Sequence, residues 1–331
     1  MELSLFLFSF LIPALIGTAI LVVWWFVVSV RRRAYVRSGG IVGSRRPFTA
    51  PALGGSILGI AVGLGLLLSY RAENGFPVFP PNRSDIWLGW LGLGMILVAL
   101  LGALSERWNT FPWLEVCGLL LGTAVAFMPV SAWLAGSADE VKSLFPGMEG
   151  ADHVMLGVVI AFAAVLFGRL QEVRPGAIIP CAFAMVFTIS ALTALASGWI
   201  SLTLFFGVIA AICGAGGLVN RLVGSLPVGR GSVFALCLPL VILPVACWCK
   251  TTPPEALYWW YWLILAGAPL LLFPCENRWF EKKLPATVAF WVRFIIVALP
   301  TIYVLVMIIP MLAGETSDGT DEFDAMMKMY E

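Results

Sequence analysis

Two charged residues inside apolar stretches are the strongest candidates for chemistry in this chain. Glu115 lies about one helical turn inside the apolar stretch 112–135, and Arg293 lies about two turns inside 287–312. Ionisable groups within a bilayer cost free energy and are therefore candidates for function. Glu115 and Arg293 are predicted to lie toward the same membrane face, where they can form an intramembrane ion pair. The alternative, which their positions favour, is that both side chains reach the nearby interface.

The other reactive side chains form no recognisable catalytic or metal-binding set. His153 is the only histidine, which excludes a His-rich metal site. Cys247 and Cys249 form a C-x-C pair with no second pair nearby in sequence, so a metal site there is weakly supported. The sequence has no phosphate-binding loop, nucleophile elbow or zinc-protease helix. We therefore predict no catalytic residue, metal or cofactor. The sequence favours a protein without enzymatic activity, but an enzyme stays open as an alternative.

The composition indicates a membrane protein. Of the 331 residues, 60% are hydrophobic and 12% are charged, and the mean hydropathy is +0.96. A soluble domain carries about 25% charged residues. The apolar stretches are about 20 residues long, the length needed for a helix to cross ~30 Å of hydrocarbon. We predict an all-α polytopic helix bundle of about ten spans, at residues 3–30, 51–70, 86–104, 112–135, 153–169, 176–197, 199–219, 232–250, 257–274 and 287–312.

The distribution of charge predicts the orientation of these spans. With the N-terminus outside, fifteen of the twenty Lys and Arg residues fall on the inner side and fourteen of the nineteen acids fall on the outer side. Positive charge concentrates in short cytoplasmic loops, so this sorting supports ten spans with both termini outside. All fourteen Trp residues lie near a predicted span end, where indole rings prefer the headgroup level.

The domain organisation follows from these spans. Residues 1–313 are predicted to form a single transmembrane helical domain, and 314–331 an acidic extracytoplasmic tail. The first span is followed directly by Arg31, Arg32 and Arg33 and is predicted to be an uncleaved anchor. The compact loops suggest a bacterial inner (plasma) membrane as the location.

Small residues at four-residue spacing predict where helices pack closely. Gly55, Gly59 and Gly63 share one helical face of the second span, and Gly118 and Gly122 repeat the pattern in the fourth. Such spacing lets helix backbones approach each other in lipid. Packing within the chain is favoured over a dimer contact, because most of ten helices have neighbours in their own chain.

Proline and glycine inside spans are candidates for broken helices around a cavity. The positions are Gly214, Pro239, Pro244 and Pro269. Interrupted helices near the bilayer midplane are a feature of transporter binding sites. Prolines are also frequent in membrane helices generally, and this second interpretation is favoured.

Two surfaces are candidates for contacts with partners. The segment 31–50 carries six Arg and no acid, and anionic lipids attract such a segment by about 1 kcal/mol per basic residue. Trp259, Trp260 and Trp262 can form a surface for a membrane protein or a lipid headgroup, although simple interfacial anchoring is favoured. The sequence contains no nucleic-acid-binding motif, and nucleic acid is not expected as a partner.

Three functions remain open on the sequence alone. The first is a carrier or permease for a small or amphipathic solute, and the second is a non-catalytic structural or assembly subunit of a membrane complex. The third, a lipid-modifying enzyme, is disfavoured because acid and histidine clusters are missing. A water-filled cavity lined by Gly214 and the three prolines favours the carrier, whereas a dry, closely packed core favours the subunit.

Overall fold

The computed structural model describes residues 6–37, 54–77, 86–108, 150–173, 177–223, 228–250, 259–276 and 285–312. All regular structure in these ranges is helical. The longer helices are α2 (Ile12–Arg37), α3 (Ile57–Asn74), α4 (Ile86–Trp108), α7 (Gly150–Val173), α8 (Ile178–Ala196), α9 (Ile200–Val223), α10 (Arg230–Lys250), α11 (Trp259–Gly267) and α13 (Ala286–Leu312). A π-helical turn, η1 (Leu7–Leu11), precedes α2, and the 3-10 segments η2 (Gly54–Ser56) and η3 (Ala268–Glu276) lie before α3 and after α11.

Six of the described helices are long and apolar enough to cross a membrane. Each coincides with a predicted span, and their apolar stretches are Leu7–Val30, Ile86–Leu104, Ile178–Ala196, Ile200–Leu222, Gly231–Trp248 and Thr287–Leu312. Shorter apolar helices lie at Met155–Leu170 and Trp259–Cys275, where the fifth and ninth spans were predicted. The predicted span 112–135, with Glu115, Gly118 and Gly122, lies outside the described residues.

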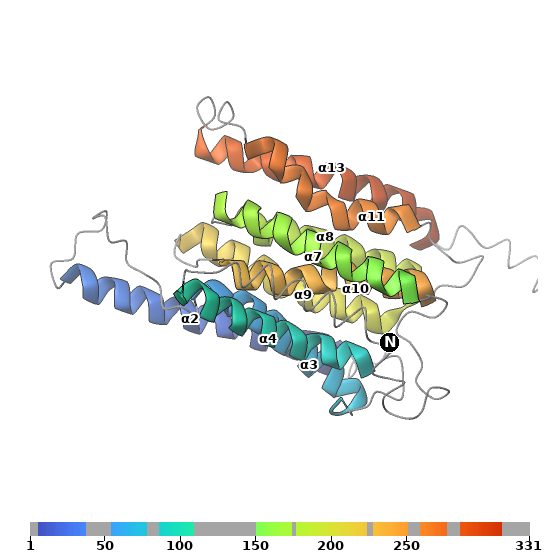
Figure 1. Cartoon of the computed structure of the whole chain (residues 1–331), viewed down its shortest axis with the longest axis horizontal. Helices are drawn as coiled ribbons and strands as arrows, with labels where there is room; N and C mark the ends of the chain where they lie inside the picture. The colour runs from blue at the N-terminus through green and yellow to red at the C-terminus, as the bar shows by residue number, and fades with distance from the viewer. Residues whose placement is uncertain are drawn as a thin grey trace, which may run out of the picture.

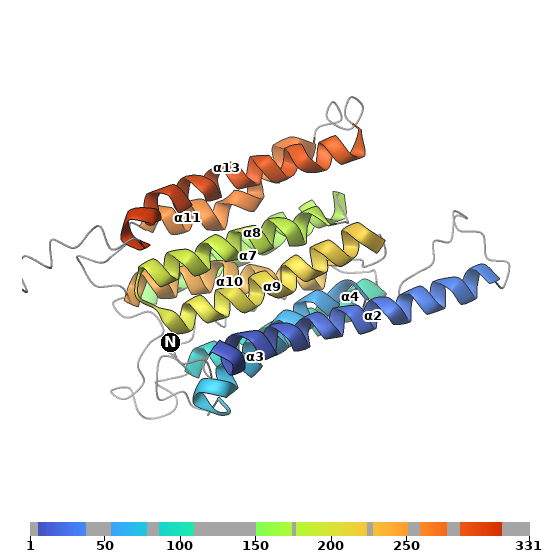
Figure 2. The same ribbon diagram turned by 180° about the vertical axis from the view of Figure 1, so that it is seen from behind.

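The helices run side by side in three layers (Figures 1 and 2). Helices α2, α3 and α4 form one layer, α7 to α10 form the middle, and α11 and α13 form the other. The apolar stretch of α10 is 89% buried within the bundle, against 28% for the stretches of α2 and α13. Helix α10 is therefore central, whereas α2 and α13 present large apolar side chains such as Phe26 and Leu299 to the exterior, as expected of helices that face lipid.

The tight hairpin between α8 and α9 follows from its turn residues. Gly198 has φ of 78°, a conformation that glycine adopts without steric cost. The Gly198 and Trp199 N–H groups donate to the carbonyls of Leu195 and Ala194, which satisfies the last turn of α8. The three-residue connection, Ser197 to Trp199, makes α8 and α9 antiparallel neighbours along their whole length.

A row of aromatic rings links the middle layer to α11. The centroids of Phe167 and Phe183 are 5.5 Å apart, those of Phe183 and Phe187 6.0 Å, and those of Phe187 and Phe206 6.1 Å. The last ring stacks on Trp262 of α11 at 6.1 Å. Aromatic pairs at these separations contribute about 0.5–1.5 kcal/mol beyond their burial. The row therefore helps to fix α11 against α9.

The glycines of α3 lie at the closest contacts with α4 and α10. A Cβ atom on Gly59 would lie 2.9 Å from Ala235 Cβ and 3.0 Å from Ala99 Cβ. The Gly55 carbonyl accepts from the Gly229 N–H at 2.6 Å and from Ser232 Oγ at 2.7 Å. Ser232 Oγ in turn accepts from the Gly59 N–H at 3.1 Å. The start of α3 is thus joined to the start of α10 by both close packing and hydrogen bonds.

Candidate functional site

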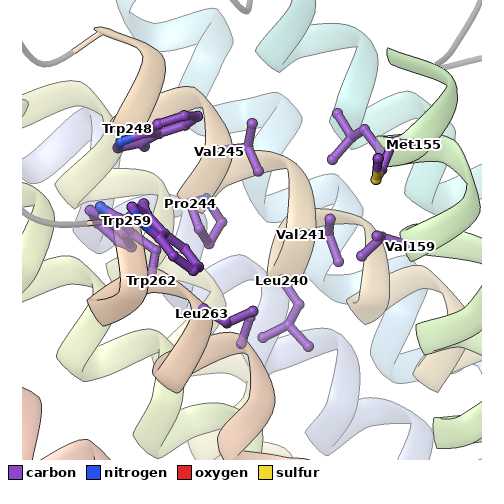
Figure 3. A pocket seen from close by; sticks show the side chains of 12 residues that line it. Met155, Val159, Leu240, Val241, Pro244, Val245, Trp248, Trp259, Trp262 and Leu263 are labelled. Atoms are coloured by element: carbon purple, nitrogen blue, oxygen red, sulfur yellow. The ribbon is translucent and has the colours of Figure 1, made fainter. Parts of the chain in front are cut away.

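An apolar groove lies between α7, α10 and α11, with a cavity volume of about 310 Å³. Figure 3 shows the side chains that converge on it. The lining residues are Met155, Leu156 and Val159 of α7; Leu240, Val241, Pro244, Val245 and Trp248 of α10; and Trp259, Trp262, Leu263 and Ala266 of α11. Ligand sites commonly have volumes from about 300 Å³ upward, so the groove is large enough for part of a small molecule.

Helical periodicity explains how each helix contributes to the groove. Along α10, Leu240, Pro244 and Trp248 recur every four residues and share one face. Trp259, Trp262 and Ala266 share a face of α11 in the same way. The groove therefore runs lengthwise along α10, in the direction that a lipid chain takes in a bilayer.

The groove has a buried floor and an exposed rim. Leu240, Val241 and Trp262 are buried, whereas Met155 and Leu263 are 66% and 59% exposed. Among the described helices, the rim thus opens sideways on their outer surface. In a membrane this surface faces hydrocarbon, so an apolar chain can enter from the bilayer without crossing water.

Two polar groups belong to residues that line the otherwise apolar groove. The Trp262 Nε1–H is buried and has no hydrogen-bond acceptor. Pro244 has no N–H, so the Leu240 carbonyl lacks the i+4 partner that it would have in an uninterrupted helix. An unsatisfied buried donor costs about 1–3 kcal/mol. A ligand that brings one acceptor beside an apolar chain would match this lining.

The structure places the four proline and glycine candidates at separate points. Pro244 lines the groove, and Pro239 is buried five residues earlier in α10. Pro269 lies in η3, where the α-helical geometry of α11 gives way to 3-10 geometry. A Cβ atom on Gly214 would meet Ala184 Cβ of α8 at 3.7 Å, so Gly214 lies at a helix contact. The groove involves one of these four positions and is apolar, unlike the water-filled cavity that a carrier of polar solutes requires.

The predicted tryptophan surface divides into residues with different surroundings. Trp259 is 57% exposed at the rim, and Trp260 is half-buried with its ring 6.1 Å from that of Tyr303 of α13. Trp262 is only 4% exposed, so it is not a surface residue. Its stacking on Phe206 explains the difference, because α11 packs against the bundle on this face.

Arg293 is buried on α13 and contacts the end of η3. Its Nη2 donates to the Cys275 carbonyl at 3.4 Å. The last carbonyls of a helix carry partial negative charge and stabilise a cation. The pairing of Arg293 with Glu115 stays a prediction, since Glu115 lies outside the described residues. Within the described ranges, no three His, Cys, Asp or Glu side chains lie close enough to hold a metal ion.

Sequence reasoning did not identify the contribution of α7 or the burial of Trp262. The four-residue recurrence of Leu240, Pro244 and Trp248 indicates one face of α10, but nothing in the sequence says which helices border it. No protein-family profile matches the chain, and neither the curated proteins nor the solved structures compared with it show a significant similarity.

Proposed function

We propose that this membrane protein carries an amphipathic, lipid-like solute that enters the groove between α7, α10 and α11 from the bilayer. The single observation that supports this function best is the composition of the groove. Its lining is apolar, its rim opens sideways, and the buried Trp262 N–H lacks an acceptor. A polar solute would lose its hydration there without replacement hydrogen bonds, whereas an apolar chain loses no favourable contact.

The proposal includes the topology predicted from the charge distribution. Ten spans with both termini outside place Trp248 and Trp259 at the outer headgroup level. The groove would then begin at the outer interface and extend inward along α10. A solute would lie with its polar end near the two indole rings and its chain toward Leu240. We also propose the bacterial inner membrane as the location, on the basis of the compact loops.

A second candidate function is a non-catalytic subunit or assembly factor of a membrane complex. The close packing of α3 against α4 and α10 favours it, because a Cβ atom on Gly59 or Gly63 would lie within 3 Å of a neighbouring helix. Such a rigid core offers no polar path for a solute. Under this alternative, the exposed apolar side chains of α7 and α11 would contact a partner helix rather than a lipid chain.

Purification in mild detergent followed by native mass spectrometry distinguishes the two functions. The carrier proposal predicts a lone chain that retains one amphipathic molecule with an acyl or isoprenoid chain. Retention of a stoichiometric protein partner and no such molecule would contradict it and support the subunit. Reconstitution into liposomes with a fluorescent analogue of the retained molecule then tests movement between leaflets.

A further inference from the structure

Helices α2 and α9 pack side by side and run in the same direction. A Cβ atom on Gly207 would meet Phe10, one on Gly17 would meet Ile212, and one on Gly216 would lie 3.5 Å from Leu21 Cδ1. Residue numbers in these contacts rise along both helices in the same direction, toward the end of the bundle where α2 reaches Arg31. We refer to this as the basic end.

Three hydrogen-bond donors lie one turn beyond the last of these contacts. Trp24 and Trp25 follow Leu21 by three and four residues, and Asn220 follows Gly216 by four. Residues at these spacings share a helical face, so both indoles and the amide continue the faces on which α2 and α9 meet. Figure 2 shows the two helices running together toward this end.

None of these donors has an acceptor. The Nε1 atoms of Trp24 and Trp25 and the Nδ2 atom of Asn220 are buried and make no hydrogen bond, and Asn220 is only 8% exposed. Buried polar groups normally have hydrogen-bond partners. Ser232, at the same end of the bundle, is an example, because its hydroxyl both donates and accepts. Buried polar groups without partners are rare, and an absent ion or ligand is one of their common explanations.

The kind of ligand follows from the donors and from the charge around them. An indole N–H can only donate, so the missing group must be rich in acceptors. Helix α2 continues from Trp25 into the run Arg31 to Arg33. The positive charge of this run favours an anion, and hydrogen bonds to charged acceptors are stronger than those to neutral ones.

We propose that Trp24, Trp25 and Asn220 bind a phosphate group at the basic end of the bundle. The group is carried either by a phospholipid headgroup or by free phosphate. The three donor atoms have almost no accessible surface, so binding requires the indole rings to move apart and admit a phosphate oxygen. This site is separate from the apolar groove. Trp248, which lines the groove, lies near the end of α10, whereas Gly231 at the start of α10 packs against Ser56 at the basic end.

The test uses delipidated full-length protein in dodecyl maltoside, a detergent without phosphate. Three additions are compared: phosphatidic acid, diacylglycerol with the same chains, and inorganic phosphate. The readouts are the melting midpoint and the number of lipids retained in native mass spectrometry. A ligand that binds the folded state raises the midpoint with concentration. We expect phosphatidic acid or inorganic phosphate to raise it, which identifies the source. Diacylglycerol should raise it less than phosphatidic acid does, because diacylglycerol can occupy the apolar groove but carries no phosphate.

Three variants and one control connect the effect to the donors. Trp24→Phe, Trp25→Phe and Asn220→Leu each remove one donor, and each should weaken the apparent phosphate affinity about tenfold. Trp291→Phe removes an indole that is 54% exposed on α13 and should change nothing. The phenylalanine variants keep an aromatic ring in place. If Asn220→Leu does not fold, the phosphate affinity of these two variants still tests the proposal.

Two results would overturn the proposal. One is an equal response to phosphatidic acid and diacylglycerol with no response to inorganic phosphate. The other is unchanged phosphate affinity in all three variants. The second outcome is independent of the apolar groove, because none of the three donors lines it.

Discussion

Gly63 of α3 and Gly92 of α4 pack with their backbones in direct contact. A Cβ atom on Gly63 would lie 2.8 Å from the Gly92 carbonyl oxygen, and one on Gly92 would lie 2.9 Å from the Gly63 carbonyl oxygen. Backbone atoms cannot yield as a flexible side chain can. The reciprocal contact therefore fixes the distance between α3 and α4, and through α3 it fixes the start of α10.

Gly92→Ala is expected to destabilise the protein, because the added methyl group meets the backbone of α3. Overpacking of this kind costs about 1–3 kcal/mol. Gly94→Ala on the same helix is the matched control, since a Cβ atom there meets nothing within 4 Å. Melting curves in detergent should give a lower midpoint for Gly92→Ala alone. Equal midpoints for the two variants would show that α3 and α4 are not in backbone contact.

Ser232→Ala is expected to lower stability through two lost hydrogen bonds. The hydroxyl joins the Gly55 carbonyl to the Gly59 N–H. Its removal leaves the Gly59 N–H without this acceptor and the Gly55 carbonyl with the Gly229 N–H as its donor. The expected cost is about 1–3 kcal/mol, measured by chemical or thermal unfolding in micelles. Ser201→Ala, at an exposed position of α9, should stay close to the native stability. A Ser232→Ala protein as stable as the native chain contradicts this role.

Filling the groove should expel its ligand. Val159→Trp adds an indole at the rim on α7, while Val158→Trp adds the same bulk at a neighbouring exposed position that does not line the groove. We expect the first variant to retain the co-purified amphipathic molecule about tenfold less, because its space is occupied, and the second to retain it normally. Native mass spectrometry provides the comparison. Equal retention by the two variants argues against the groove as the binding site.

Trp262→Phe should separate ligand binding from stability. The phenyl ring can still stack on Phe206, but the unpaired N–H is gone. If a ligand acceptor uses this N–H, the affinity should fall about threefold to tenfold, the effect of losing one neutral hydrogen bond. Affinity is measured by titrating the identified ligand into delipidated protein. Unchanged affinity together with a higher melting midpoint would mean that the N–H takes no part in binding.

The periodic and local features of the fold could be predicted from the sequence, whereas the groove could not. Hydropathy alone located the six long apolar helices, and Ser197 and Gly198 alone indicated the hairpin between α8 and α9. The groove depends on which helices are neighbours, and no local pattern in α7 or α10 indicates that both line a groove together with α11. The exposure of tryptophan is similarly non-local. Trp259 and Trp262 lie three residues apart, yet Phe206 of α9 covers only the second.

The most direct test of the account is movement of an amphipathic molecule by the purified protein. Liposomes are prepared with a fluorescent analogue of the retained ligand, and chemical quenching from outside measures its exchange between leaflets. The account predicts that protein-containing liposomes exchange the analogue, that Val159→Trp reduces the rate about tenfold, and that Val158→Trp leaves the rate unchanged. No exchange above that of protein-free liposomes, with a ligand still bound, would contradict the carrier function.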